Sequence, residues 1–194
     1  KGRTEGSIMS EYFFQKAIPA VRESRAQILA SVAVFTIAIP VGYAVPGQFS
    51  GSLEYLSELA SYLKDKSVLA IIFFLFIKNF LASLLVLWTG TLLGIIPLVA
   101  AVQNGYLLGA VLSLQGNPFI GFISLLPHGV FELPAFFLAC GMGLWRGLWL
   151  FRRYQEESYR SRAKKSYVVL YRLIVPLLAI AAIIEGASIS LAVS

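Results

Sequence analysis

Long apolar runs alternate with short polar stretches along this chain, and five of the runs are long enough to cross a lipid bilayer. A helix of about 20 apolar residues spans the hydrocarbon core. In chain order, the predicted spans are 28–45, 67–88, 91–114, 127–151 and 167–193. The pattern therefore predicts an all-α, polytopic transmembrane helix bundle that forms a single membrane domain over residues 1–194.

The apolar run from Pro118 to Phe151 is too long for one straight span. As one helix it would extend about 50 Å, whereas a hydrocarbon core is about 30 Å thick. Proline favours the first turn of a helix and disrupts a helix interior, so we expect a break at Pro127. Residues 118–126 then form a short interfacial or re-entrant segment. Pro176, in the last span, is expected to kink that helix without ending it.

The segments between the spans also show a pattern. Spans 67–88 and 91–114 are joined so closely that we expect them to pack as an antiparallel hairpin. Apolar residues recur at helical spacing over 53–63, which predicts an amphipathic helix lying on the membrane surface. Residues 1–27 carry a similar stripe among basic residues and are predicted to form an amphipathic basic segment.

Lysines and arginines cluster in two groups, one in 1–27 and one in the connection 152–166 with its flanks. A bundle of five spans places both groups on one side, and the positive-inside rule makes that side cytoplasmic. Glu156 precedes Arg160 by four residues, so the connection is expected to be a solvated helical extension. We therefore expect a multi-pass protein of the cell membrane with a cytoplasmic N-terminus.

Composition supports a membrane environment. Hydrophobic residues make up 58% of the chain and charged residues 13%, whereas soluble domains carry about 25% charged residues. The net charge of +6 does not indicate nucleic-acid binding, because the basic residues lie beside apolar runs and match no nucleic-acid motif. The expected partners are the lipid bilayer and other membrane proteins or further copies of this chain.

Placing an ionisable side chain at the centre of a membrane-spanning helix costs about 2.5–3.5 kcal/mol on insertion scales. Each such residue in the predicted spans therefore indicates a structural or functional role. His128 and Glu132 are four residues apart and therefore share one helix face near the outer end of the fourth span. A rise of 1.5 Å per residue brings Glu185 in the last span to a similar depth. The second and third spans add three polar residues near mid-depth, Lys78, Asn79 and Asn104.

Two interpretations of these six residues remain open. In one they form a ligand site, where His128, Glu132 and Glu185 could coordinate a divalent metal ion such as zinc. In the other they form a buried hydrogen-bond network that fixes helix packing, with Lys78 neutralising a carboxylate. The only histidine cannot complete a two-histidine zinc-protease motif. Cys140 has no second histidine to activate it and is expected to be a core residue, so no catalytic residue is assigned.

Glycines recur at the four-residue spacing that lets helices approach closely. The pairs are Gly90 with Gly94, Gly105 with Gly109, and Gly143 with Gly147. We expect them to pack helices within one bundle and not between two copies of the chain.

Segment 125–136 reads LLPHGVFELPAF and, followed by Gly141 and Gly143, resembles the signature of the stage II sporulation protein M family. Asn79, the NGYLLG segment at 104–109 and the Glu185-Gly186 pair resemble further family landmarks. The resemblance implies a multi-spanning membrane protein. In spore-forming bacteria it implies a scaffold that assembles a cell-wall-remodelling complex during engulfment.

The first functional expectation is thus a non-enzymatic scaffold or assembly factor with a buried polar cluster near its outer face. A small transporter or channel that uses the histidine and glutamates as a cation or proton site is the alternative. A second alternative is an intramembrane metal enzyme with Glu132 or Glu185 as base and His128 as ligand.

Overall fold

The structure is a computed structural model that describes residues 17–63, 66–91, 94–151 and 157–193. The elements are α2 (Arg25–Ala44), η1 (Pro46–Phe49), α3 (Ser50–Leu63), α4 (Val68–Thr89), α5 (Ile95–Ser113), α6 (Pro118–Gly147), η2 (Leu148–Leu150), α7 (Tyr159–Val169), η4 (Leu170–Ile174) and α8 (Val175–Val193). Five helical segments are long and apolar enough to cross a membrane. The predicted all-α transmembrane bundle is confirmed.

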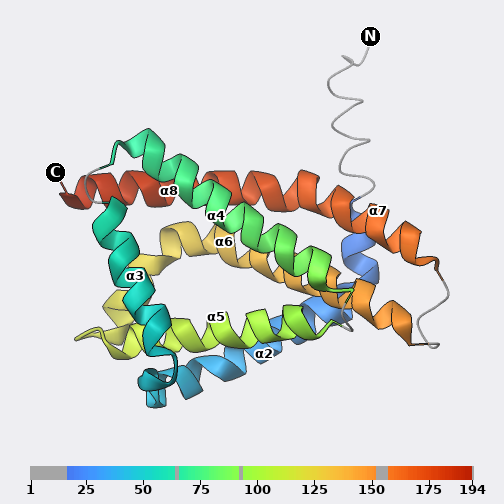
Figure 1. Cartoon of the computed structure of the whole chain (residues 1–194), viewed down its shortest axis with the longest axis horizontal. Coiled ribbons are helices and arrows are strands. Elements are labelled where there is room, and N and C mark those ends of the chain that lie inside the picture. Colours follow the sequence, from blue (N-terminus) through green and yellow to red (C-terminus); the bar gives the residue numbers. More distant parts are fainter. Residues whose placement is uncertain (1–16, 64–65, 92–93, 152–156, 194) are drawn as a thin grey trace, which may run out of the picture.

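Helix α6 lies at the centre of the bundle and contacts α2, α4, α5 and α8 (Figure 1). Helix α5 packs mainly against α2, and α4 packs mainly against α8. Helices α4 and α5 run antiparallel, as expected, but contact each other little because α6 lies between the two helix pairs. The expectation that α4 and α5 pack as a hairpin is therefore wrong.

The expected break at Pro127 is also wrong, because α6 is helical from Pro118 to Gly147. The Asn117 side chain accepts hydrogen bonds from the backbone N–H groups of Phe119 and Ile120, which caps the helix start, and Pro118 occupies the favoured first turn. Pro127 and Pro134 lie inside the helix, where proline bends the axis without ending it. The α6 ribbon changes direction in this part, and residues 118–126 are its first turns (Figure 1).

Pro176 is accommodated differently. The helix that begins at Tyr159 passes through the π-helical segment η4 just before this proline and continues to Val193. A π-turn adds one residue to the helical turn. The carbonyl groups before the proline then no longer clash with its ring or need its absent N–H as a hydrogen-bond donor. The prediction that Pro176 does not end its helix is confirmed.

Helix α3 crosses one end of the bundle, and α7 lies at the opposite end (Figure 1). The predicted helix over 53–63 is confirmed as part of α3, in which Leu63 is buried while Glu54 and Glu58 are exposed. Of the N-terminal basic segment, residues 1–16 lie outside the described part of the chain. Residues 17–23 are helical, with Ala17 and Ala20 fully buried.

The glycine pairs pack helices inside the bundle, as predicted. A Cβ built on Gly105 or Gly109 would overlap backbone atoms of α2, and one on Gly143 or Gly147 would overlap the backbone of α4 or its following turn. Gly94 also adopts a positive φ of 72°, which favours glycine in the turn before α5. Close backbone contact therefore fixes the α7 end of α6 against α4.

The connection between α6 and α7 is less solvated than expected. Arg146 is only 3% exposed and Arg162 only 5%. Arg146 donates to the carbonyl of Leu87 at 3.0 Å, and Arg162 donates to the carbonyl of Trp145 at 2.8 Å. The expectation of a solvated extension is wrong for Arg162, and Arg146, at the end of the preceding span, is buried in the same way. Both guanidinium groups donate hydrogen bonds to carbonyls near helix ends. Glu156 lies outside the described residues.

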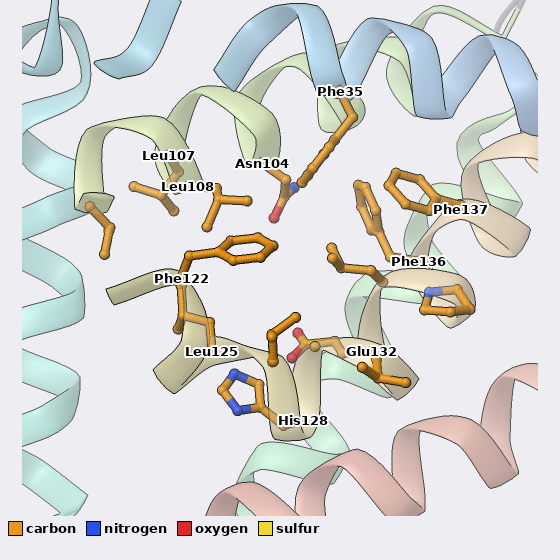
Figure 2. Close-up of a pocket in the computed structure, with 16 residues that line it drawn as sticks. Phe35, Asn104, Leu107, Leu108, Phe122, Leu125, His128, Glu132, Phe136 and Phe137 are labelled. Atoms are coloured by element: carbon orange, nitrogen blue, oxygen red, sulfur yellow. The ribbon is translucent and has the colours of Figure 1, made fainter. Parts of the chain in front are cut away.

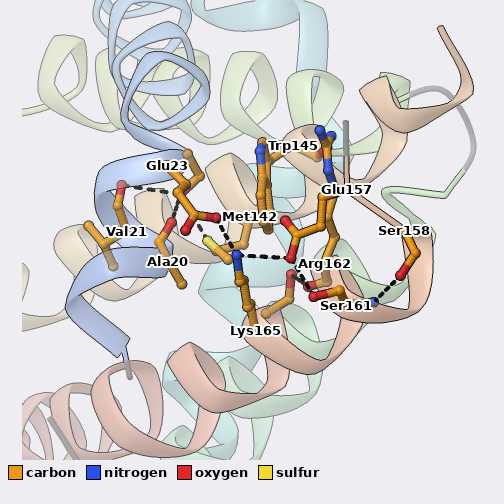
Figure 3. Close-up of polar contacts among 12 residues, drawn as sticks. Ala20, Val21, Glu23, Met142, Trp145, Glu157, Ser158, Ser161, Arg162 and Lys165 are labelled. Atoms are coloured by element: carbon orange, nitrogen blue, oxygen red, sulfur yellow. Dashed lines mark hydrogen bonds and ion pairs between the residues drawn. The ribbon is translucent and has the colours of Figure 1, made fainter. Parts of the chain in front are cut away.

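Lys165 links three segments at this end of the bundle (Figure 3). Its Nζ lies 2.6 Å from a carboxylate oxygen of Glu23 and 2.9 Å from one of Glu157. Burial alone would raise the pKa of Glu157, but hydrogen bonds from Ser161 and Lys165 hold that pKa below its ordinary value. Ion pairs therefore join the segment before α2 to α7.

Candidate metal centre beside an apolar cavity

Three side chains from two helices meet near the α3 end of the bundle. His128 and Glu132 lie one turn apart on α6, and Glu185 comes from α8, which packs against α6. One ligand atom from each residue lies within 4.8 Å of the other two. All three residues are half-buried. The structure thus brings together the histidine and both glutamates that helix geometry placed at one depth.

Packing of α8 against α4 helps to position Glu185. Gly186, the next residue, is buried, and a Cβ built there would lie 2.5 Å from Cγ1 of Ile72 on α4. A larger residue would push the two helices apart. The Glu-Gly pair therefore combines a carboxylate of the cluster with a close approach of α8 to α4.

The cluster brings two carboxylates close to one histidine and one lysine. Glu132 interacts electrostatically with Glu185, His128 and Lys78 of α4. Two carboxylates this close repel each other, and the repulsion is stronger in the low dielectric between membrane helices than in water. One lysine offsets part of it. A bound divalent cation would offset the rest.

The donor set suits such a cation. Zinc binds histidine nitrogen and carboxylate oxygen at about 2.0–2.2 Å, and three protein ligands leave one position open. Ligand atoms within 4.8 Å of one another need only small side-chain rotations to reach a common ion. His128, Glu132 and Glu185 are therefore the residues that would hold the metal.

A cavity of about 530 Å³ lies beside this cluster, between α6, α5 and α2 (Figure 2). His128 and Glu132 line one side, and Asn104 of α5 lines the opposite wall. Most of the remaining lining is apolar and includes Phe35, Leu107, Phe122, Leu125, Phe136 and Phe137. The pattern of apolar residues in the sequence does not predict this cavity. Its only signal was the pair Pro127 and Pro134, because a bent helix can line a cavity with residues from both of its arms.

The other predicted site residues have different positions. Asn104 reaches the cavity, and its side-chain amide donates to the carbonyl of Ala100 at 2.8 Å. Lys78 is half-buried on α4 and within electrostatic range of Glu132. Asn79 is half-buried on the same helix and does not line the cavity. Cys140 is fully buried, which confirms it as a core residue.

A family model described as stage II sporulation protein M matches residues 31–188, which include every residue of the cluster. No curated protein and no solved structure matches the chain. The match covers more than half of the 194 residues, and the chain belongs to the stage II sporulation protein M family.

Proposed function

We propose that this chain is a membrane protein that binds a divalent cation such as zinc through His128, Glu132 and Glu185. The observation that supports the proposal is that three potential ligand atoms lie within 4.8 Å of one another. They come from α6 and α8, which are far apart in the sequence. Ionisable residues inside a membrane are expensive, and a cation offsets their repulsion while using all three.

Cation binding is favoured over a through-going channel by the packing of the bundle. At the α7 end, α6 touches the turn after α4 through Gly143 and Gly147, where even a methyl group would overlap backbone atoms. Such contact opposes a continuous polar path along this face of α6. A transport role would require the α7 end to open.

Metal analysis of the purified protein tests the proposal. We expect about one zinc per chain after dialysis against trace zinc, measured by inductively coupled plasma mass spectrometry. His128→Ala, Glu132→Gln and Glu185→Gln should each lose about ten- to a hundredfold or more in zinc affinity, since each removes one ligand. Glu58→Gln, an exposed carboxylate on α3, is the matched control and should bind zinc normally. Equal zinc content in wild type and all three site variants would refute the site.

A scaffold or assembly role is the second candidate, and α3 is the feature that favours it. This helix crosses the end of the bundle and exposes Glu54, Glu58 and 57% of Tyr62, a mixed surface suited to a protein partner (Figure 1). Membrane-protein partners or further copies of this chain should then co-purify in mild detergent. The variant Tyr62→Ala should weaken that association, and a protein that stays monomeric and alone would exclude this role.

We also propose that the α7 end faces the cytoplasm and the cluster lies near the outer face of the cell membrane. The support is the concentration of lysine and arginine around α7. Single cysteines placed by Lys164→Cys on α7 and Glu58→Cys on α3, in a Cys140→Ala background, test the orientation in intact cells. An impermeant maleimide should label only the α3 position, and labelling of the α7 position alone would reverse the topology.

A further inference from the structure

We infer that the cavity beside the metal centre holds the apolar chain of an amphiphile whose phosphate group takes the open coordination position of the bound metal. This inference rests on the proposed function and names its ligand class. The ligand is a lipid-like phosphate ester. The metal site binds its anionic phosphate, and the apolar walls of the cavity contact its hydrocarbon chain.

The walls of the cavity suit a hydrocarbon chain. Its volume of about 530 Å³ falls within the range of small-molecule sites, about 300–1,000 Å³. Phe35 of α2 packs edge-on against Phe137 of α6, with ring centroids 5.1 Å apart, and its ring also lies 6.2 Å from that of Phe136. Apolar walls such as these favour contact with apolar groups over contact with water.

The cavity opens toward the surface that the bilayer would cover. Phe122, Leu126 and Val130 line it and are 45%, 40% and 57% exposed. All three belong to the part of α6 around Pro127, within a predicted membrane-crossing segment. Apolar residues exposed there contact lipid chains, so an amphiphile can reach the cavity sideways without leaving the membrane.

The polar end of the cavity selects the head group. His128 and Glu132 line the cavity and also belong to the metal centre. A divalent ion held by two carboxylates and a neutral imidazole is uncharged overall, and Lys78 adds positive charge nearby. The open position therefore attracts an anionic oxygen, which a phosphate ester supplies, and repels a cationic head group.

Binding of radiolabelled dodecyl phosphate to the purified full chain in lipid nanodiscs tests the inference, with empty nanodiscs as blank. With zinc present we expect saturable binding that weakens at least about tenfold when zinc is chelated. Dodecanol, which lacks the phosphate, and inorganic phosphate, which lacks the chain, should each compete at least about tenfold less well.

Gly129 is a position where the cavity can be filled while all three candidate ligand side chains are kept. It lines the cavity, and a Cβ built there meets nothing within 4 Å. Gly129→Leu should reduce dodecyl phosphate binding at least about tenfold while zinc content stays normal. Gly51→Leu is the matched control, because a Cβ on this exposed α3 glycine also meets nothing within 4 Å, and it should leave both measurements unchanged.

The outcomes separate this inference from the proposed function. A chain that binds zinc but shows no saturable dodecyl phosphate binding, or a Gly129→Leu variant that binds the probe normally, overturns the inference alone. Equal competition by inorganic phosphate overturns the placement of the chain in the cavity. Zinc-independent binding of the probe overturns the metal–phosphate contact. Failure to bind zinc overturns the proposed function and this inference together.

Discussion

Both arms of α6 contain glycines, but these glycines have opposite surroundings. In the arm near α7, Gly143 and Gly147 touch the backbone at the end of α4, and residues 139–147 are all buried. In the arm near α3, Gly129 faces open space beside the cavity, and many neighbours are exposed. One helix thus has a tightly packed arm and an open arm that carries His128 and Glu132 beside the cavity. What decides the role of each glycine is the surface that it faces.

The largest expected effect follows from enlarging a glycine in the packed arm. Gly143→Leu places a side chain where a Cβ already overlaps backbone, so α6 and α4 must separate. We expect a loss of at least about 3 kcal/mol in stability or a failure to fold, at the upper end of overpacking effects. Thermal unfolding in detergent measures it.

Gly129→Leu is the counterpart in the open arm. It should change the unfolding temperature little, because leucine there enters free space and has a better helix propensity than glycine. Equal destabilisation by the two substitutions would remove the contrast between the arms.

Zinc should stabilise the open arm by a smaller amount. A ligand that binds only the folded state adds about 2.7 kcal/mol at a hundredfold excess over its Kd. We expect zinc to raise the unfolding temperature of the wild type and of Glu58→Gln, and to raise that of Glu185→Gln by clearly less, because its weaker affinity leaves a smaller ratio of zinc to Kd. A zinc-induced rise of the same size in Glu185→Gln would show that the ion acts elsewhere.

The smallest effect concerns the ion pairs at the α7 end. The pKa of Glu157 lies below its ordinary value in the folded chain. The contribution of its ionised carboxylate to the free energy of unfolding is therefore complete above the unfolded pKa of about 4.3. It is lost as the pH falls through the lower, folded pKa. Exposed ion pairs are worth about 1 kcal/mol or less. Unfolding temperatures between pH 6 and pH 3 should therefore fall slightly less steeply in Glu157→Gln than in the wild type, and identical slopes would contradict this role.

The sequence predicted five membrane-spanning helices, because their number depends on length and composition alone. The rise of 1.5 Å per residue was enough to bring Glu185 level with Glu132. The continuity of α6 was not predictable in this way, since the capping Asn117 and the bend at two prolines outweigh the usual effect of proline. The separation of α4 from α5 depends on where α6 packs, and local spacing carries no such information.

The buried arginines and the cavity were missed for a related reason. Arg162 looks like a solvated charge in the sequence, and Arg146 lies at the end of the span before it. Hydrogen bonds to nearby helix carbonyls make the burial of both side chains favourable. The cavity exists because α2, α5 and the bent α6 leave space between aromatic side chains from distant segments. Such features follow from tertiary packing and not from the periodicity of any one helix.

The π-helical segment η4 determines how far α8 is rotated about the helix axis relative to α7. Lys165 precedes it and Glu185 follows it, about 30 Å further along at 1.5 Å per residue. Removing one residue from Leu170–Ile174 would rotate Glu185 by about 100° around the axis relative to Lys165. The position of Glu185 beside His128 therefore depends on a helix phase that residues far from the cluster set.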